Sequence, residues 1–312
     1  MSELLSVVAP VFLVIAVGYV AVRTHAFADG HVDALMAFTQ HIAIPCLLFR
    51  AVMDLDLATV FRPALLISFY AGATLSFFLG IWGARALFGR RPGEAVAIGF
   101  GALFSNSVML GLPITERAFG AEVLQITFAV IAIHAPFCYL LGITVMEVSR
   151  ADGRSARATA GAVVNAMVKN ALAIGLALGF AVNLSGVVLP YVVVSALDMV
   201  VRTALPVALF ALGGVLTRYR IRASLGPVAM VATLSLVLHP AITYTLSSLV
   251  FSLPPGFVQA ATTTAAMAPG VNTYVFASLY HRAEDVAAAT VLLATGVSLL
   301  SVTIWLSILS RL

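Results

Sequence analysis

Apolar stretches long enough to cross a bilayer follow one another along almost the whole of this 312-residue chain. Only 10% of the residues are charged, against about 25% in soluble domains. A spanning helix needs about 20 apolar residues, so the pattern predicts an all-α polytopic membrane protein with ten transmembrane helices in the lipid bilayer. We expect the spans at residues 4–22, 32–53, 62–88, 94–117, 121–147, 163–183, 190–216, 224–251, 257–280 and 285–310.

Arginine falls mostly on one side of these spans. The loops after spans one, three, five, seven and nine hold Arg23, Arg85, Arg90, Arg91, Arg150, Arg154, Arg157, Arg218, Arg220, Arg222 and Arg282. The opposite side holds Arg62, Arg117 and Arg311. Positive loops stay preferentially in the cytoplasm, so we expect both termini on the outer, periplasmic side of the plasma (inner) membrane. The net charge of +4 therefore reflects topology and does not indicate a nucleic-acid partner.

The two halves of the chain repeat short sequence patterns. The matching pairs are Gly18-Tyr19 with Gly179-Phe180, Pro45-Cys-Leu-Leu-Phe49 with Pro206-Val-Ala-Leu-Phe210, and Asn106-Ser-Val-Met-Leu-Gly111 with Asn272-Thr-Tyr-Val-Phe-Ala277. With five spans in each half, the second copy must enter the membrane from the opposite side. The sequence thus predicts a 5+5 inverted repeat, an architecture common among secondary transporters. The predicted repeats are residues 1–148 and 163–312, joined by a cytoplasmic linker at 149–162.

One segment in each half interrupts its own hydrophobic span. Span four carries Ser105, Asn106, Ser107, Gly111 and Pro113, and span nine carries Pro269, Gly270, Asn272 and Thr273. Such residues weaken or interrupt helices, and non-helical backbone at membrane depth is tolerated only inside protein or along a cavity. Interrupted spans in both halves are a sequence pointer to a binding site, so we expect helices four and nine to be broken.

A helix that starts in mid-membrane presents unpaired backbone N–H groups and the positive end of its dipole. A carboxylate can accept several hydrogen bonds there without a buried arginine, and asparagine amides can add further donors. The predicted substrate-binding set is Asn106, Asn272, Ser105, Thr273, Ser107 and Gly270. The predicted structural and kink residues are Pro45, Pro206, Gly111, Pro113 and Pro269. The alternative interpretation is that the polar residues only pack helices together.

Titratable side chains within the spans are candidates for proton coupling. His134 and His239 can titrate near neutral pH, although a histidine in a span is more often a packed, hydrogen-bonded residue. Asp198 is a third candidate, but it precedes Arg202 by four residues, so we expect these two to form a structural ion pair on one helix face. Arg50 is expected to extend to the outer interface. The pattern predicts no metal site.

The motifs of spans four and nine resemble those of the auxin efflux carrier family. The similarity rests on Asn106-Ser-Val-Met-Leu-Gly-Leu-Pro-Ile114 and on Pro269-Gly-Val-Asn-Thr-Tyr-Val-Phe-Ala-Ser-Leu-Tyr280. The resemblance implies that the broken helices four and nine cross at a substrate site. It also implies a scaffold of spans 1, 2, 6 and 7, a transport bundle of spans 3–5 and 8–10, and a homodimer through the scaffold helices.

Three features differ from the plant members of that family. Ser105 and Thr273 stand where plant carriers often have proline, which leaves the breaks less rigid. Span three contains no carboxylate, so one candidate for a proton-coupling acid is missing. The long central loop of many plant members is also absent.

These observations predict a secondary transporter of small organic anions, such as mono- or dicarboxylates or auxin-like acids, that works by alternating access without a cofactor. A sodium-coupled symporter of the bile-acid type would need carboxylates near the crossing, and none is present there. A channel stays open as an alternative, because sequence does not reveal gating. We do not expect an enzyme: the chain has no His-Glu-x-x-His motif for a metalloprotease, and Asp198 stands alone as a membrane aspartate.

Overall fold

The computed structural model describes residues 2–150, 171–219 and 225–312, and every regular element in these residues is helical. Seven helical runs are long and apolar enough to cross a membrane: Ser6–Arg23, Asp29–Met53, Pro63–Ala86, Ser107–Ser149, Tyr191–Leu216, Leu225–Val250 and Glu284–Leu309. Shorter apolar helices lie at Pro92–Leu103 and Ala171–Ser185. The all-α polytopic class is therefore confirmed. Most of the predicted linker 149–162 and the start of the span predicted at 163–183 lie outside the described residues.

The chain forms two compact units, and each unit takes segments from both halves of the sequence. Unit 1 consists of Met1–Ala9, Phe61–Val163 and Tyr219–Leu312, and unit 2 consists of Pro10–Val60 and Val164–Arg218. These residue ranges agree with the expected grouping of residues 62–147 with 224–310, and of residues 4–53 with 163–216. The difference is that the first nine residues of span one belong to unit 1.

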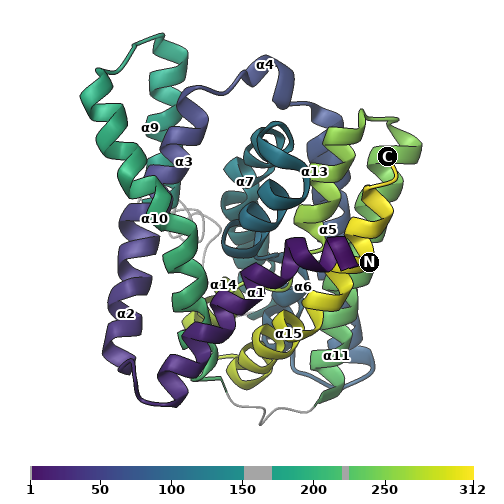
Figure 1. Ribbon diagram of the computed structural model, residues 1–312. Helices are drawn as coiled ribbons and strands as arrows, with labels where there is room; N and C mark the ends of the chain where they lie inside the picture. Colours follow the sequence, from purple (N-terminus) through teal and green to yellow (C-terminus); the bar gives the residue numbers. More distant parts are fainter. Residues whose placement is uncertain (1, 151–170, 220–224) are drawn as a thin grey trace. The chain divides into compact units, whose positions relative to one another are not determined.

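In unit 2, α9 runs beside α3 in the same direction (Figure 1), since Gly175 meets Pro45 and Gly179 meets Phe49. Its helices are α1 (Ser2–Arg23, from Pro10 onward), α2 (Asp29–Phe38), η1 (Thr39–Ala43), α3 (Ile44–Met53), α4 (Leu57–Val60), α9 (Ala171–Ser185) and α10 (Tyr191–Leu216). The π-helical η1 joins α2 to α3 without a gap, so these three pieces form the run predicted as span two.

Glycines let the helices of unit 2 pack backbone against backbone. A Cβ atom at Gly179 of α9 would lie 2.8 Å from the carbonyl oxygen of Phe49 in α3, too close for any side chain. Gly18 of α1 meets the carbonyl oxygen of Phe210 in α10 in the same way. Small residues permit such close helix contacts in membranes. In the sequence repeat, Gly18 matches Gly179 and Phe49 matches Phe210. The glycine of each half thus packs against the phenylalanine of the other half.

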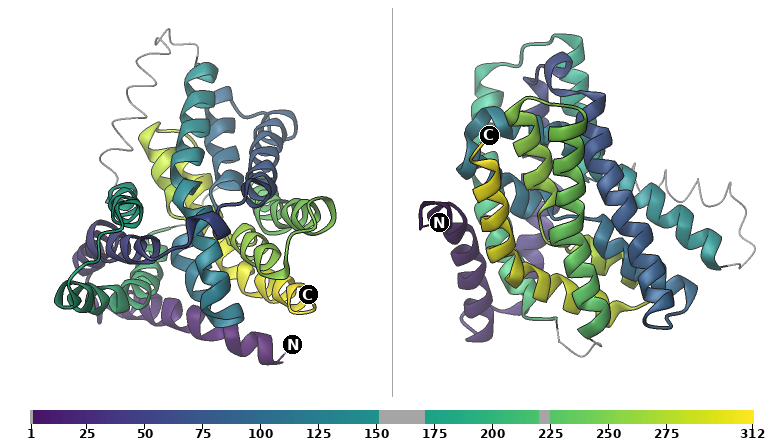
Figure 2. Two further views of the ribbon diagram at one scale, coloured as in Figure 1. Left: turned by 90° about the horizontal axis from the view of Figure 1, so that it is seen from above. Right: turned by 90° about the vertical axis from the view of Figure 1, so that its right-hand side faces the viewer.

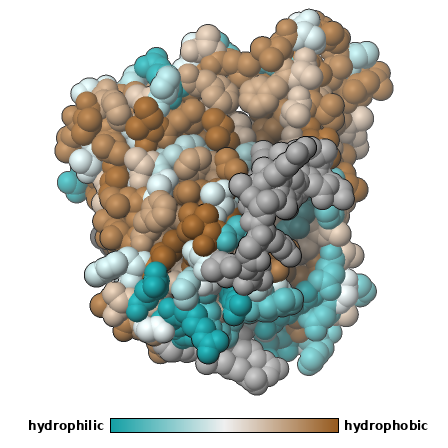
Figure 3. Space-filling view, turned by 180° about the vertical axis from the view of Figure 1, so that it is seen from behind, coloured by the Kyte–Doolittle hydropathy of each residue, from teal (hydrophilic) through white to brown (hydrophobic). Residues whose placement is uncertain are grey.

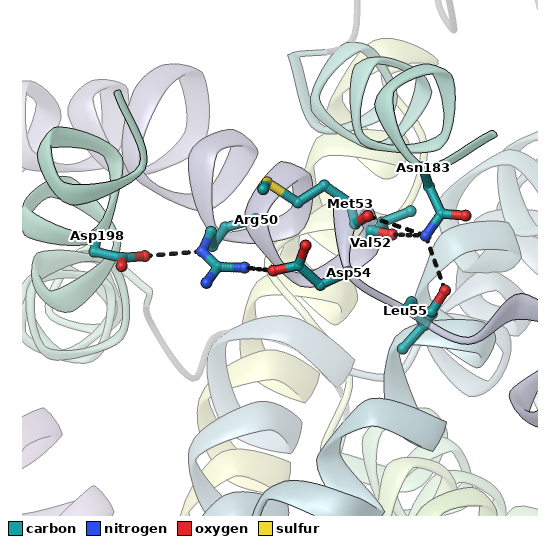
Figure 4. A network of polar contacts seen from close by, with 7 residues as sticks. All are labelled: Arg50, Val52, Met53, Asp54, Leu55, Asn183 and Asp198. Atoms are coloured by element: carbon teal, nitrogen blue, oxygen red, sulfur yellow. Dashed lines mark hydrogen bonds and ion pairs between the residues drawn. The ribbon is translucent and has the colours of Figure 1, made fainter. Parts of the chain in front are cut away.

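A side-chain amide holds the C-terminal end of α3 (Figure 4). The Nδ2 atom of Asn183, in α9, donates to the carbonyl oxygens of Val52 (3.0 Å), Met53 (3.0 Å) and Leu55 (2.8 Å). The last carbonyl groups of a helix have no partner within the helix. Asn183 therefore supplies the hydrogen bonds that α3 cannot make for itself.

Unit 1 is organised around closely packed helices with small side chains. Its elements are α5 (Pro63–Ala86), α6 (Pro92–Leu103), η2 (Ser107–Gly111), α7 (Leu112–Arg150), α11 (Leu225–Thr233), η3 (Leu234–Leu238), α12 (His239–Tyr244), η4 (Thr245–Val250), α13 (Pro255–Ala265), α14 (Asn272–Leu279) and α15 (Glu284–Leu309). One buried cluster joins α5, α6, α11 and α15: Ala84, Ala95, Ile98, Ala102, Val228, Val231, Val286 and Ala289. Both views of Figure 2 show α15 (yellow) beside α13 (light green).

A glycine divides α7 into two helical pieces. Gly120 has φ 78° and ψ −172°, which is not helical and suits only a residue without a Cβ atom. The turn falls between the spans predicted at 94–117 and 121–147. The sequence therefore placed this boundary correctly.

The exposed surface is largely apolar. Trp82, Met199 and Leu300 have exposed fractions of 61%, 69% and 67%. Figure 3 shows hydrophobic residues over most of one face, with hydrophilic residues gathered toward one edge. Soluble proteins rarely expose apolar patches of this extent, whereas the tails of lipids can cover them. The surface thus agrees with the bilayer as the surroundings of these helices.

Candidate functional site

Unit 1 contains both interruptions predicted from the sequence. In the first half, α6 ends at Leu103 and helical structure resumes at Ser107. In the second half, α13 ends at Ala265 and α14 begins at Asn272. The non-helical segments are therefore residues 104–106 and 266–271, which include the polar, glycine and proline positions that the sequence analysis singled out.

The two non-helical segments pair with each other through their backbones. The N–H of Asn106 donates to the carbonyl of Ala268 at 2.8 Å, and the N–H of Gly270 donates to the carbonyl of Phe104 at 3.1 Å. Ser105 and Pro269 face each other in the resulting antiparallel β-bridge. Both bonds run through the neighbours of Pro269, so its missing N–H costs nothing there. The bridge gives partners to backbone groups that the breaks remove from the helices.

Beside the bridge, two helical pieces begin with unpaired backbone donors. Within the described part of the chain, the amides of Val108, Met109 and Asn272 make no backbone hydrogen bond. By contrast, the amides of Leu110 and Gly111 bond to the carbonyl of Asn106 at 3.2 and 3.0 Å. Unpaired N–H groups are expected in the first turn of any helix, and they carry the positive end of its dipole.

Three side chains of the predicted set also lack partners. The Oγ of Ser105, the Nδ2 of Asn106 and the Oγ1 of Thr273 are buried, and none has a hydrogen-bond partner within the described residues. The exposed fractions of these residues are only 2%, 7% and 1%. A buried polar group without a partner costs about 1–3 kcal/mol, so such a group calls for an explanation. A ligand that accepts hydrogen bonds would supply one.

The glycines and prolines of the two motifs lie close to these donors. A Cβ atom on Gly270 would meet Cα, Cβ and Cγ of Asn106 at 3.5–3.7 Å, which is ordinary van der Waals contact. Gly111 lies in the same way against the side chain of Met267. Pro113 is buried in the first turn of α7, and Ser107 is buried at the start of η2. The structure therefore brings the motif residues of both halves together.

Asn272 has a side-chain partner that the sequence analysis missed. The hydroxyl of Tyr139, in α7, donates to Oδ1 of Asn272 at 3.2 Å. The tyrosine ring lies 5.7 Å from the rings of both Phe100 and Phe104. A phenol within an apolar span usually finds a hydrogen-bond partner, and that rule was the available signal for Tyr139.

The two buried histidines donate to backbone carbonyls. Nε2 of His134 lies 3.1 Å from the carbonyl oxygen of Ser105, and Nε2 of His239 lies 3.2 Å from that of Phe69. A carbonyl oxygen can only accept, so each Nε2 carries a proton. The ring of Phe69 lies 5.5 Å from His134 and 4.9 Å from His239. His134 thus contacts the first break directly, while a role of either histidine in proton coupling stays a prediction.

Asp198 has a different partner from the one expected. Its Oδ1 accepts from Nε of Arg50 at 3.0 Å, and Arg50 also pairs with Asp54 (Figure 4). The predicted pair of Asp198 with Arg202 is therefore wrong: the arginine comes from α3, since close packing in unit 2 brings its guanidinium within reach. Arg50 bridges two carboxylates, and its expected extension to the outer interface stays a prediction.

The remaining predicted structural residues, Pro45 and Pro206, lie in unit 2. Pro45 is buried at the second residue of α3, directly after the π-helical η1. A proline inside a continuous helical run commonly accompanies such a local departure from α-helical bonding. The carbonyl oxygen of Pro45 lies against Gly175 of α9. Pro206 lies inside α10, where a proline removes one helical hydrogen bond. Neither residue belongs to the bridged breaks of unit 1.

Comparison with known proteins agrees with this arrangement of helices. The family described as "Membrane transport protein" matches residues 4–306. A protein of Rhizobium meliloti (strain 1021) named "Putative malonate transporter" is 24% identical over 311 residues, which cover 97% of this chain and 95% of that protein. Both matches are to transporters and not to enzymes, as expected. Because the family match covers nearly the whole chain and confirms the resemblance to auxin efflux carriers, this chain belongs to the membrane transport protein family.

Proposed function

We propose that this chain is a secondary transporter that carries small organic anions across the plasma (inner) membrane by alternating access. The substrates would be mono- or dicarboxylates or auxin-like acids. The observation that carries the proposal is the bridged pair of breaks in unit 1, where unpaired donors gather without a matching acceptor. Anions bind readily at helix starts of this kind. The carboxylate would sit where the broken helices four and nine cross, next to residues 104–106 and 266–271.

The donors of this site are neutral. Neither residues 104–115 nor residues 255–280 contain Asp, Glu, Lys or Arg. Attraction would come from the free amides of Val108, Met109 and Asn272 and from the side chain of Asn106. A carboxylate offers about four lone-pair positions, which suits this number of donors. A site without a full positive charge would also release its substrate readily, as transport requires.

The packing of the helices supports ten spans in a 5+5 inverted repeat with halves at 1–148 and 163–312. Asn106 ends the first break and Asn272 directly follows the second, so the two asparagines lie at nearly the same place in each half. The contacts of Gly18 with Phe210 and of Gly179 with Phe49 join matching positions of the two halves, which is a second observation in favour of the repeat. In this proposal unit 2 is the scaffold and unit 1 is the transport bundle that carries the substrate. Movement of one repeat-built bundle against another is the usual form of alternating access.

The sequence and the exposed surface support the proposed topology and assembly of the transporter. The arginine bias of the loops supports a periplasmic position for both termini. The apolar outer faces of α9 and α10, where Leu184 and Val192 are 76% and 75% exposed, would suit a homodimer through the scaffold helices as well as contact with lipid.

Ligand-induced stabilisation tests the substrate class. Purified protein is heated with malonate, other mono- and dicarboxylates, an auxin-like acid, a neutral amide and an ammonium compound, with and without sodium and at two pH values. A ligand that binds only the folded state raises the melting temperature, so we expect carboxylates alone to do so. Counterflow of labelled malonate in proteoliposomes then separates transport from binding. Stabilisation by neutral or cationic solutes and by no anion would overturn the substrate class.

A further inference from the structure

Tyr139 contacts both breaks, because its hydroxyl donates to Asn272 and its ring packs against Phe104. The proposed function gives this residue no role. We infer that Tyr139 is a positioning residue: its hydroxyl orients the amide of Asn272 so that the proposed site prefers carboxylates to neutral analogues of the same shape. This inference rests on the proposed function, because it concerns the selectivity of that site.

The hydrogen bond leaves the donor end of the amide free. The Tyr139 hydroxyl donates to Oδ1 of Asn272 at 3.2 Å, so the acceptor end of the amide is occupied. Among the described residues, Nδ2 of Asn272 has no hydrogen-bond partner. Asn272 is half-buried at the first residue of α14, and its own backbone N–H makes no backbone hydrogen bond among the described residues. This residue therefore offers both a side-chain donor and a backbone donor.

Orientation matters because the two ends of an amide are chemically opposite. The oxygen only accepts and the nitrogen only donates. If the amide turned over, its oxygen would face the bound carboxylate, and two acceptors would repel each other. A neutral amide ligand carries both donors and acceptors, so it could match either orientation. A fixed amide therefore discriminates against the neutral ligand by withholding an acceptor from it.

Aromatic packing keeps the Tyr139 hydroxyl in place. The ring of Tyr139 lies edge-on to Phe104, the first residue of the first break, at 5.7 Å. It also lies 5.7 Å from Phe100, which stacks on Phe276 at 3.9 Å with an interplanar angle of 7°. Phe276 belongs to α14, the helix that Asn272 begins. The ring and the amide that it orients are thus held by the same cluster.

The matching asparagine of the first half lacks this partner. Nδ2 of Asn106 is buried without a hydrogen bond within the described residues, and no tyrosine hydroxyl bonds to its oxygen there. The two asparagines therefore differ in the hydrogen bonding of their side-chain amides: Tyr139 orients the amide of Asn272 before a ligand binds, and no tyrosine does so for Asn106. Selectivity should depend on Tyr139 and Asn272 together.

The test compares Tyr139→Phe with the unaltered chain in binding of malonate and of its neutral diamide. Removing one neutral hydrogen bond should raise the Kd for malonate about three- to tenfold, while the Kd for the diamide stays the same or falls. In an Asn272→Ala background, Tyr139→Phe should have no further effect on malonate. The matched control is Tyr70→Phe, because the Tyr70 hydroxyl donates to the carbonyl of Val130 at 2.7 Å, away from either asparagine. This control should change neither Kd.

Each other outcome has a definite meaning. Unchanged malonate binding in Tyr139→Phe, equal losses for both ligands, or a full further loss in the Asn272→Ala background would overturn the positioning role and leave the proposed function intact. Asn272→Asp gives a second route if Tyr139→Phe does not fold. It keeps an acceptor for Tyr139 and removes both amide hydrogens, so wild-type affinity for malonate in this variant would also overturn the inference. An unaltered protein that binds no carboxylate would overturn the proposed function, and the inference with it.

Discussion

Replacement of Asn106 by alanine should weaken substrate binding without weakening the fold. The backbone of Asn106 forms the bridge to Ala268 and accepts from Leu110 and Gly111, and alanine keeps all of these bonds. The side chain contributes Nδ2, which is buried and unpartnered. The substitution therefore separates the two roles of this residue cleanly.

The expected magnitudes follow from that geometry. An unsatisfied buried donor costs about 1–3 kcal/mol in the ligand-free protein, and alanine removes this cost while losing some packing. The free energy of unfolding should therefore stay the same or rise slightly. A hydrogen bond to a charged ligand contributes about 1.5–3 kcal/mol, so the Kd for malonate should rise by about 10- to 150-fold.

Thermal unfolding and malonate titration measure both quantities on one sample. Asn183→Ala is the matched control, since it makes the same chemical change where Nδ2 donates to three carbonyls. The control should lower the melting temperature and leave the Kd unchanged. If Asn106→Ala instead destabilises the ligand-free protein as much as Asn183→Ala does and binds malonate normally, the site has been misplaced.

Further predictions concern packing, an ion pair and topology. Gly179→Ala should lower the free energy of unfolding by about 1–3 kcal/mol through overpacking. The control Gly30→Ala, where an added Cβ would meet nothing within 4 Å, should be neutral or slightly stabilising in a helix. Calorimetry that ranks the two variants the other way would contradict the packing of α9 on α3. Asp198→Asn should cost less than about 1 kcal/mol, because the pair is partly exposed, and should leave malonate counterflow intact; loss of counterflow would make Asp198 a coupling group. In a background without the native cysteines, Ser185→Cys should react with an impermeant thiol reagent outside intact cells and Thr24→Cys only after permeabilisation, and the reverse pattern would refute the proposed orientation.

The breaks could be predicted because their cause is local. Asn106 and the Pro269-Gly270 pair interrupt helices by their own backbone chemistry, so an apolar span that contains them is recognisable without any knowledge of its neighbours. Gly120 is a similar case, since its positive φ serves a turn between two apolar stretches.

The partners of the polar side chains could not be predicted in this way. Asp198 bonds to Arg50 across 148 residues of sequence, and Tyr139 bonds to Asn272 across 133. Reasoning along one helix face proposed Arg202 for Asp198, because spacing in sequence says nothing about which other helix packs nearby. Such pairs depend on how the helices pack, which short motifs do not encode.

The amide of Asn183 also has a consequence for how the chain is made. Its bond to Val52 joins residues that are 131 positions apart, and ribosomes add about 5–20 residues each second. For roughly 7–26 s, the end of α3 exists without its cap, and the carbonyl of Phe49 has no glycine of α9 against it. Until the second half is made, the first-half helices of unit 2 therefore lack these contacts. A chaperone or a slow step in synthesis between the halves would matter most during this interval.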